Sequence, residues 1–168
     1  GQVIDLITGG VLAEHGEFNG QISYGEDVIS RIVFAEKPGG LEKISAVVID
    51  TINKILKRIV KESGVDPEDI STITLAGNTT MTQLMLAVNP RSIRRAPYVP
   101  AATLYPPLKA ADLGMDLVGH VTALVYPAVS SYVGGDIVAG VMGSGIYRSE
   151  ALTLYLDVGT NAEIVIGN

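Results

Sequence analysis

The most informative stretch of this 168-residue sequence is LYLDVGTNAEIV, at residues 154–165. Two apolar runs flank a short polar segment, which predicts two strands joined by a turn. Asp157 falls at the end of the first strand, so its carboxylate is expected to point out of the sheet. Gly159 has no Cβ and therefore allows a ligand to approach the backbone closely.

The turn of this hairpin has the composition of a phosphate-binding loop. Thr160, Asn161 and the backbone amides of the turn supply hydrogen-bond donors for phosphate oxygens. A carboxylate beside a phosphate requires a cation, and Mg²⁺ prefers one or two carboxylates together with phosphate oxygens and water. The alternative interpretation is a plain polar turn in which Asp157 bonds its own backbone, because short motifs often match by chance.

The rest of the chain predicts an α/β layer fold, in which a mixed sheet is flanked by helices. A capping box at Ser23 and Glu26 predicts the start of one helix, and isoleucine or valine recurring from Ile44 to Ile59 predicts the next. The remaining expected elements are an N-terminal hairpin (2–7 and 11–14), strands (70–76 and 121–126), helices (81–88 and 131–144) and a proline-rich irregular crossing (89–107).

Two expected helix starts carry residues that suit a ligand. Gly77-Asn78-Thr79-Thr80 lies where a strand passes into a helix, and the amides of a helix start favour anions. Capping of the helix by Asn78 or a threonine explains the same residues. Gly134-Gly135-Asp136 opens a glycine-rich helix, where close packing is the simpler explanation and Asp136 as a ligand to water or metal is the alternative.

Composition excludes several classes of function. The chain has a net charge of −6, which argues against nucleic acid as a partner. It has no cysteine and two histidines, so it carries no cysteine-bound cluster and a histidine-rich metal site is not expected.

No run of about 20 apolar residues is present and no signal peptide opens the sequence, so we expect a cytoplasmic protein without membrane contact. Arg91, Arg94 and Arg95 form a small basic cluster, either a solvated loop or a site for a phosphate or an acidic partner.

The order of elements and the Asp-x-Gly-Thr turn resemble the actin/Hsp70/sugar-kinase superfamily, whose two lobes are of ribonuclease-H type and each open with a phosphate hairpin. By this resemblance, residues 1–150 form the first lobe without its first strand and first phosphate loop. Residues 151–168 then form the opening hairpin of the second lobe, and both ends of the chain are interpreted as cut edges within a larger fold.

Four further motifs narrow the resemblance. They occur in order: YGEDVISRI (24–32), AGNTTM (76–81), APYVP (96–100) and YVGGD (132–136). Together they resemble the C-terminal domain of ATP-dependent reductive activators of corrinoid proteins. Ala162 departs from this family's pattern, which more often has glycine between the asparagine and the glutamate.

This resemblance implies an ATPase that drives the one-electron reduction of Co(II) corrinoid to Co(I) in a methyl-transfer protein. The cofactors are then ATP and Mg²⁺, with a [2Fe–2S] cluster only in a separate N-terminal domain of the parent protein. Asp157 would order Mg²⁺ through water, and Gly159, Thr160, Asn161 and residues 77–80 would contact the nucleotide. Residues 134–136 would border the cleft or the partner surface.

Two other classes stay open at this point. One is a small-molecule kinase of the same superfamily, with Asp136 as its candidate base. The other is a non-catalytic scaffold that binds nucleotide to stabilise an assembly, and a homodimer is compatible with each reading. Because the chain has one of two phosphate loops and no recognisable adenosine pocket, we expect it to be inactive by itself.

Overall fold

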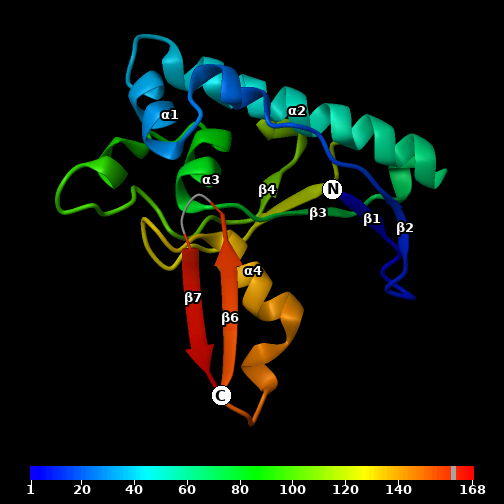
Figure 1. Ribbon diagram of the computed structural model, residues 1–168. Coiled ribbons are helices and arrows are strands. Elements are labelled where there is room, and N and C mark those ends of the chain that lie inside the picture. The colour runs from blue at the N-terminus through cyan, green and yellow to red at the C-terminus, as the bar shows by residue number, and fades with distance from the viewer. Residues whose placement is uncertain (160–161) are drawn as a thin grey trace.

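The computed structural model describes residues 1–159 and 162–168 (Figure 1). It is a mixed α/β structure, as expected, with a mixed sheet flanked by helices. The elements are β1 (Gln2–Ile4), β2 (Val11–Glu14), α1 (Val28–Ala35), α2 (Gly40–Ser63), β3 (Thr72–Leu75), α3 (Thr79–Met85), β4 (Leu108–Lys109), β5 (Thr122–Val125), α4 (Gly135–Ser144), β6 (Thr153–Val158) and β7 (Ala162–Gly167).

The main sheet has the strand order β3-β5-β4. β3 is parallel to β5, and β4 is antiparallel to it. Parallel neighbours require a long crossover, and here α3 and the irregular segment up to β4 supply it. β1 with β2 and β6 with β7 form two separate antiparallel hairpins.

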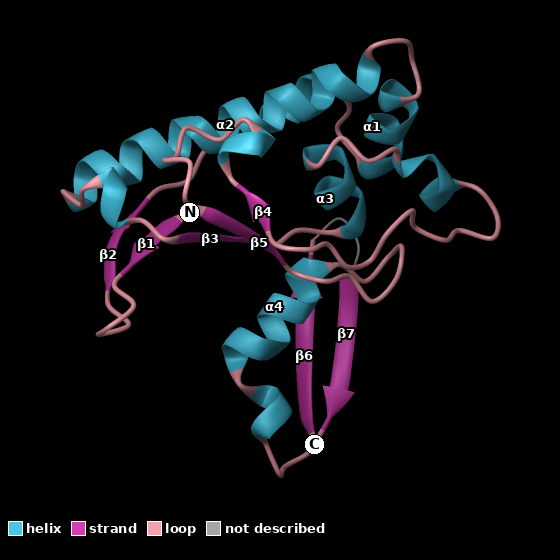
Figure 2. Ribbon diagram, turned by 180° about the vertical axis from the view of Figure 1, so that it is seen from behind, coloured by secondary structure: helices cyan, strands magenta, loops and turns pink. Residues whose placement is uncertain are grey.

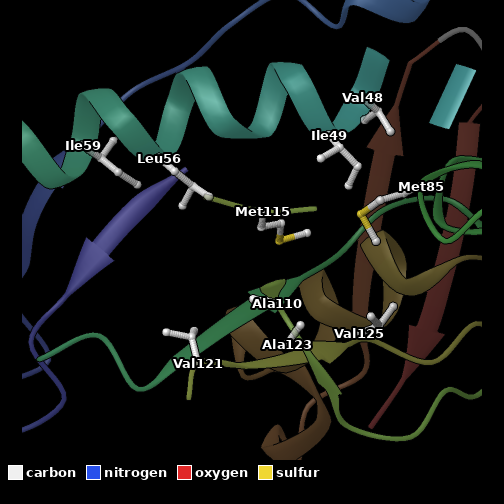
Figure 3. Close-up of a cluster of buried hydrophobic side chains, with 10 residues drawn as sticks. All are labelled: Val48, Ile49, Leu56, Ile59, Met85, Ala110, Met115, Val121, Ala123 and Val125. Carbon is white, nitrogen blue, oxygen red and sulfur yellow. The ribbon is translucent and has the colours of Figure 1, made fainter. Parts of the chain in front are cut away.

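α2 covers one face of the sheet and forms most of the core (Figure 3). Its apolar side chains recur every three or four residues, so they form one stripe that packs against alternate residues of β5, Ala123 and Val125. Of the expected stripe, Ile44 and Ile59 are buried, whereas Ile52 and Ile55 are only partly buried. Both of these border a cavity beneath the helix.

The capping-box prediction at Ser23 is wrong. Ser23 lies in a short 3₁₀ turn (Gly20–Tyr24), and α1 begins after Asp27, whose carboxylate accepts a hydrogen bond from the Ser30 amide at 2.8 Å. Aspartate and serine are both favoured as helix N-caps, so the sequence offered two candidate N-caps, Ser23 and Asp27, four residues apart. Hydrogen bonds to Ser30, first to its amide and then to its hydroxyl, lower the pKa of Asp27.

Several other boundaries move. β1 ends at Ile4 rather than residue 7, because Asp5 accepts hydrogen bonds from the amides of Ile7 and Thr8 and forms a turn. The helix expected from residue 131 begins at Gly135, since the preceding residues form a bend closed by hydrogen bonds to the Val133 carbonyl. The short strand β4 was not expected at all.

The β6–β7 hairpin extends away from the main sheet and lies beside α4, as both views show (Figure 2). Asp157 was expected at the end of its strand, but it lies one residue before that end and pairs with Glu163 on β7. In the described part of the chain, no helix is long and apolar enough to cross a membrane.

Candidate functional site

The two predicted glycine-containing helix starts lie against each other. A Cβ added at Gly134, before α4, would be 2.5 Å from the Cα of Asn78 and 2.6 Å from the amide nitrogen of Thr79. The Asp136 amide donates to the Gly77 carbonyl at 3.2 Å. The structure therefore brings residues 77–80 and 134–136 together, although they are more than 50 positions apart in the sequence.

At the start of α3, the side chains serve the fold. The Asn78 side-chain oxygen, Oδ1, caps the helix by accepting from the Met81 amide at 2.8 Å, and the Thr79 hydroxyl donates to the Ser130 carbonyl at 2.6 Å. Thr79 and Thr80 are each 2% exposed, which leaves their hydroxyls little access to a ligand. Capping by Asn78 is thus confirmed, and contact of residues 77–80 with a nucleotide stays a prediction.

The start of α4 is packed as tightly but is less completely capped. A Cβ at Gly135 would be 2.8 Å from the Tyr126 carbonyl oxygen, so a side chain has no room there. Gly134, the residue before the helix, has no side chain with which to cap it, and Asp136 accepts from the Ile137 amide at 2.9 Å. Close packing at Gly134 and Gly135 is therefore confirmed.

The β6–β7 hairpin presents a polar face toward α4. The Tyr155 hydroxyl lies over Gly140, where an added Cβ would be 2.0 Å from it. Asp157 is two residues further along the same strand, and alternate residues of a strand share a face. β6 runs antiparallel to α4 in both views, so Asp157 lies at the end of β6 nearest the start of that helix.

Sequence reasoning assigned no role to Glu163, directly opposite Asp157 in the hairpin. Both carboxylates are partly buried on the same face. Like charges in directly opposed positions repel, and a cation between them would relieve that repulsion. The signal was present in the sequence, because two acids that flank a tight hairpin turn at equal distances must pair across it.

The structure gives few contacts for the remaining predicted site residues, which follow Asp157 in the sequence. Gly159 is exposed just after β6, and Thr160 and Asn161 lie outside the described residues. Within the ranges 1–159 and 162–168, no three metal-binding side chains gather in one place. A cation at Asp157 and Glu163 would therefore take its other ligands from phosphate oxygens and water.

This chain matches one protein family over most of its length. A protein-family model described as the RACo middle region matches residues 1–149. The chain belongs to the RACo middle-region family. The corrinoid-activator resemblance of the four motifs is thereby confirmed.

Two relatives show how far the likeness of this RACo middle-region chain extends. A corrinoid activation enzyme, RamQ of Eubacterium limosum, is 34% identical over 169 residues, which cover all of this chain and 28% of that protein. A solved structure named as a reductive activator for corrinoid, iron-sulfur protein is 44% identical, with a TM-score of 0.94 over 99% of this chain and 27% of its own. The chain thus spans little more than a quarter of the relatives it matches.

Proposed function

We propose that this chain supplies one side of a Mg-ATP cleft in a protein that reduces Co(II) corrinoid to Co(I) in a methyl-transfer corrinoid protein. In this proposal, residues 1–150 form a first lobe of the actin/Hsp70/sugar-kinase type, and residues 151–168 open the second lobe. The observation that carries the proposal is the contact of the α3 and α4 starts, with Asp157 on the strand that runs along α4.

The geometry suits a nucleotide phosphate in two respects. Gly134, the residue before α4, has no side chain with which to cap that helix, and the positive end of the helix dipole favours an anion there. Asp157 and Glu163 place two carboxylates on one face of the β6–β7 hairpin, and these would hold a divalent cation that neutralises phosphate charge.

An opening in the structure supports the assignment to a lobe of this type. A cavity of about 1140 Å³ is lined by β1, β3 and the underside of α2, including Ile52 and Ile55. Among the described residues, β1 pairs with β2 alone and β3 with β5 alone, so each has a free edge. An extended strand in the cavity would join the hairpin to the main sheet, and the lobe's expected first strand fits this role.

Bound Mg-ATP would supply the free energy that selects a closed arrangement of the two lobes, by its higher affinity for that arrangement. The residues of this chain would hold the nucleotide: the start of α4 on its phosphates, and Asp157 on the cation through water. A [2Fe–2S] cluster would supply the electron that reduces the Co(II) corrinoid. With no cysteine in its sequence, this chain cannot hold that cluster, which the proposal assigns to a separate domain.

The test is equilibrium binding of ATP to the full-length parent protein, titrated with and without Mg²⁺. Asp157→Asn should weaken Mg-ATP binding about tenfold or more and reduce its dependence on Mg²⁺, because one charged ligand interaction is lost. The matched control is Asp50→Asn on the exposed face of α2, which should leave binding unchanged. Equal affinities in all three proteins, or phosphorylation of an added alcohol or carboxylate substrate, would contradict the proposal.

A further inference from the structure

The loops at residues 95–107 and 127–134 carry exposed apolar side chains that the candidate site does not use. Both project from the same end of the molecule, opposite the C-terminal end of α2 (Figures 1 and 2). We call this surface the loop patch. Its members are apolar or aromatic and exposed: Tyr98, Val99, Leu104, Val129 and Tyr132.

The loop patch is held in one arrangement by hydrogen bonds between the two loops. The Tyr132 hydroxyl donates to the Ile93 carbonyl at 3.1 Å, and the Ser131 hydroxyl donates to the Tyr98 carbonyl. The Ala128 amide donates to the Thr103 carbonyl at 2.8 Å. These bonds fix the loops before any partner arrives, which reduces the entropy lost on binding.

The side chains of the loop patch are exposed although hydrogen bonds fix the loops that carry them. Tyr98, Val99 and Tyr132 keep between 50% and 59% of their surface exposed. Tyr98 also has a positive φ of 61°, an uncommon conformation for a non-glycine residue, which its neighbours maintain. Tyrosine on a rigid loop is typical of protein interfaces, where it contributes a large contact area.

A basic rim adjoins the loop patch. Arg91, Arg94 and Arg95 come from the same loop as Tyr98, and the Tyr98 amide bonds the Arg95 carbonyl at 2.6 Å. Among the described residues, Glu36 is the carboxylate that pairs with this cluster, through Arg94 and Arg95. Arg94 and Arg95 thus share one carboxylate and Arg91 adds a third positive charge to the same loop, on a chain whose net charge is −6.

We propose that the loop patch and its arginine rim are the docking surface for the corrinoid protein that this family activates. The partner surface that fits has an apolar centre bordered by carboxylates, because the rim is cationic where the rest of the chain is acidic. This proposal rests on the proposed function. It adds the place of contact, next to the residues at the α4 start that would respond to nucleotide.

The test measures binding of the full-length parent to a corrinoid protein whose Co(II) form it reduces, by surface plasmon resonance at two salt concentrations. Val99→Asp should weaken binding at least tenfold, because it puts an unpaired charge into an apolar contact. Arg91→Glu should slow association and weaken its salt dependence, because Arg94 and Arg95 remain beside Glu36. Lys57→Glu, an equal charge change on the exposed surface of α2, is the matched control and should have no effect.

Binding of ATP is measured on the same proteins and should be equal in all of them, since neither substitution touches residues 77–80, 134–136 or 157. Unchanged corrinoid-protein binding in both Val99→Asp and Arg91→Glu would overturn the docking proposal and leave the nucleotide proposal intact. A change in self-association instead, seen by sedimentation, would overturn it in favour of a second copy of the chain. A parent that reduces no corrinoid protein would refute the proposed function itself.

Discussion

The contact between the starts of α3 and α4 predicts a large effect for one methyl group. In Gly134→Ala, the new Cβ would meet three backbone atoms of residues 78 and 79 at 2.5 to 2.8 Å. Carbon contacts are most favourable at about 3.5–4.0 Å, so one helix start must move by roughly 1 Å. Overpacking of this kind costs about 3 kcal/mol, near the upper end of the usual range.

Gly143→Ala is the matched control, because nothing lies within 4 Å of a Cβ at that position of α4. There alanine should stabilise the helix by about 1 kcal/mol. The two variants should therefore differ by about 4 kcal/mol, or roughly a thousandfold in the opening equilibrium.

The assay is native-state hydrogen exchange of the full-length parent, read by mass spectrometry on peptides from α3 and α4. Gly134→Ala should accelerate exchange in both helices, and Gly143→Ala in neither. If the two variants exchange alike, the starts of α3 and α4 are not in contact, and the proposed nucleotide site loses the observation that carries it.

Three further outcomes follow from the packing of α1 and α2. Asp27→Ala should destabilise the parent by about 1 kcal/mol through loss of the helix cap, whereas Ser23→Ala should not, and urea unfolding distinguishes them. The Arg94 hydrogen bond to Glu36 lowers the pKa of the Glu36 carboxyl. The ion pair therefore stabilises the fold fully above the ordinary pKa of 4.5, and this stabilisation is lost as pH falls through the lower folded pKa. Glu36→Gln should lower the melting temperature at pH 7 and flatten the decline of the melting temperature toward pH 3, and a parallel decline in both proteins would show that the pair is not formed. Ile44→Ala should cost about 3 kcal/mol, because the side chain is 0% exposed, and a cost below about 1 kcal/mol would contradict its burial.

Local pattern was sufficient to predict the helices and the longer strands, but not all of their ends. The stripe from Ile44 to Ile59 predicts α2 because burial against a sheet imposes the helical period. The start of α1 was missed because Ser23 and Asp27 offer equivalent caps, and only packing selects between them. β4 was missed because two residues carry no period, and its pairing with β5 exists only in three dimensions.

The candidate site shows the same division. Its residue types were recognisable in residues 77–80, 134–136 and 157, although capping, close packing and a plain turn account for the same residues. Their juxtaposition was not, because contact between Gly134 and Asn78 depends on how the crossover closes. The pairing of Glu163 with Asp157 was predictable from hairpin register and was overlooked.

The measurement that tests the account most directly is reduction of a Co(II) corrinoid protein by the full-length parent, followed by visible absorption. Wild type should form Co(I) only when Mg-ATP is present, and Asp157→Asn should fail to do so while its reduced iron–sulfur bands are unchanged. Equal Co(I) formation without ATP, or by the Asp157→Asn variant, would contradict it.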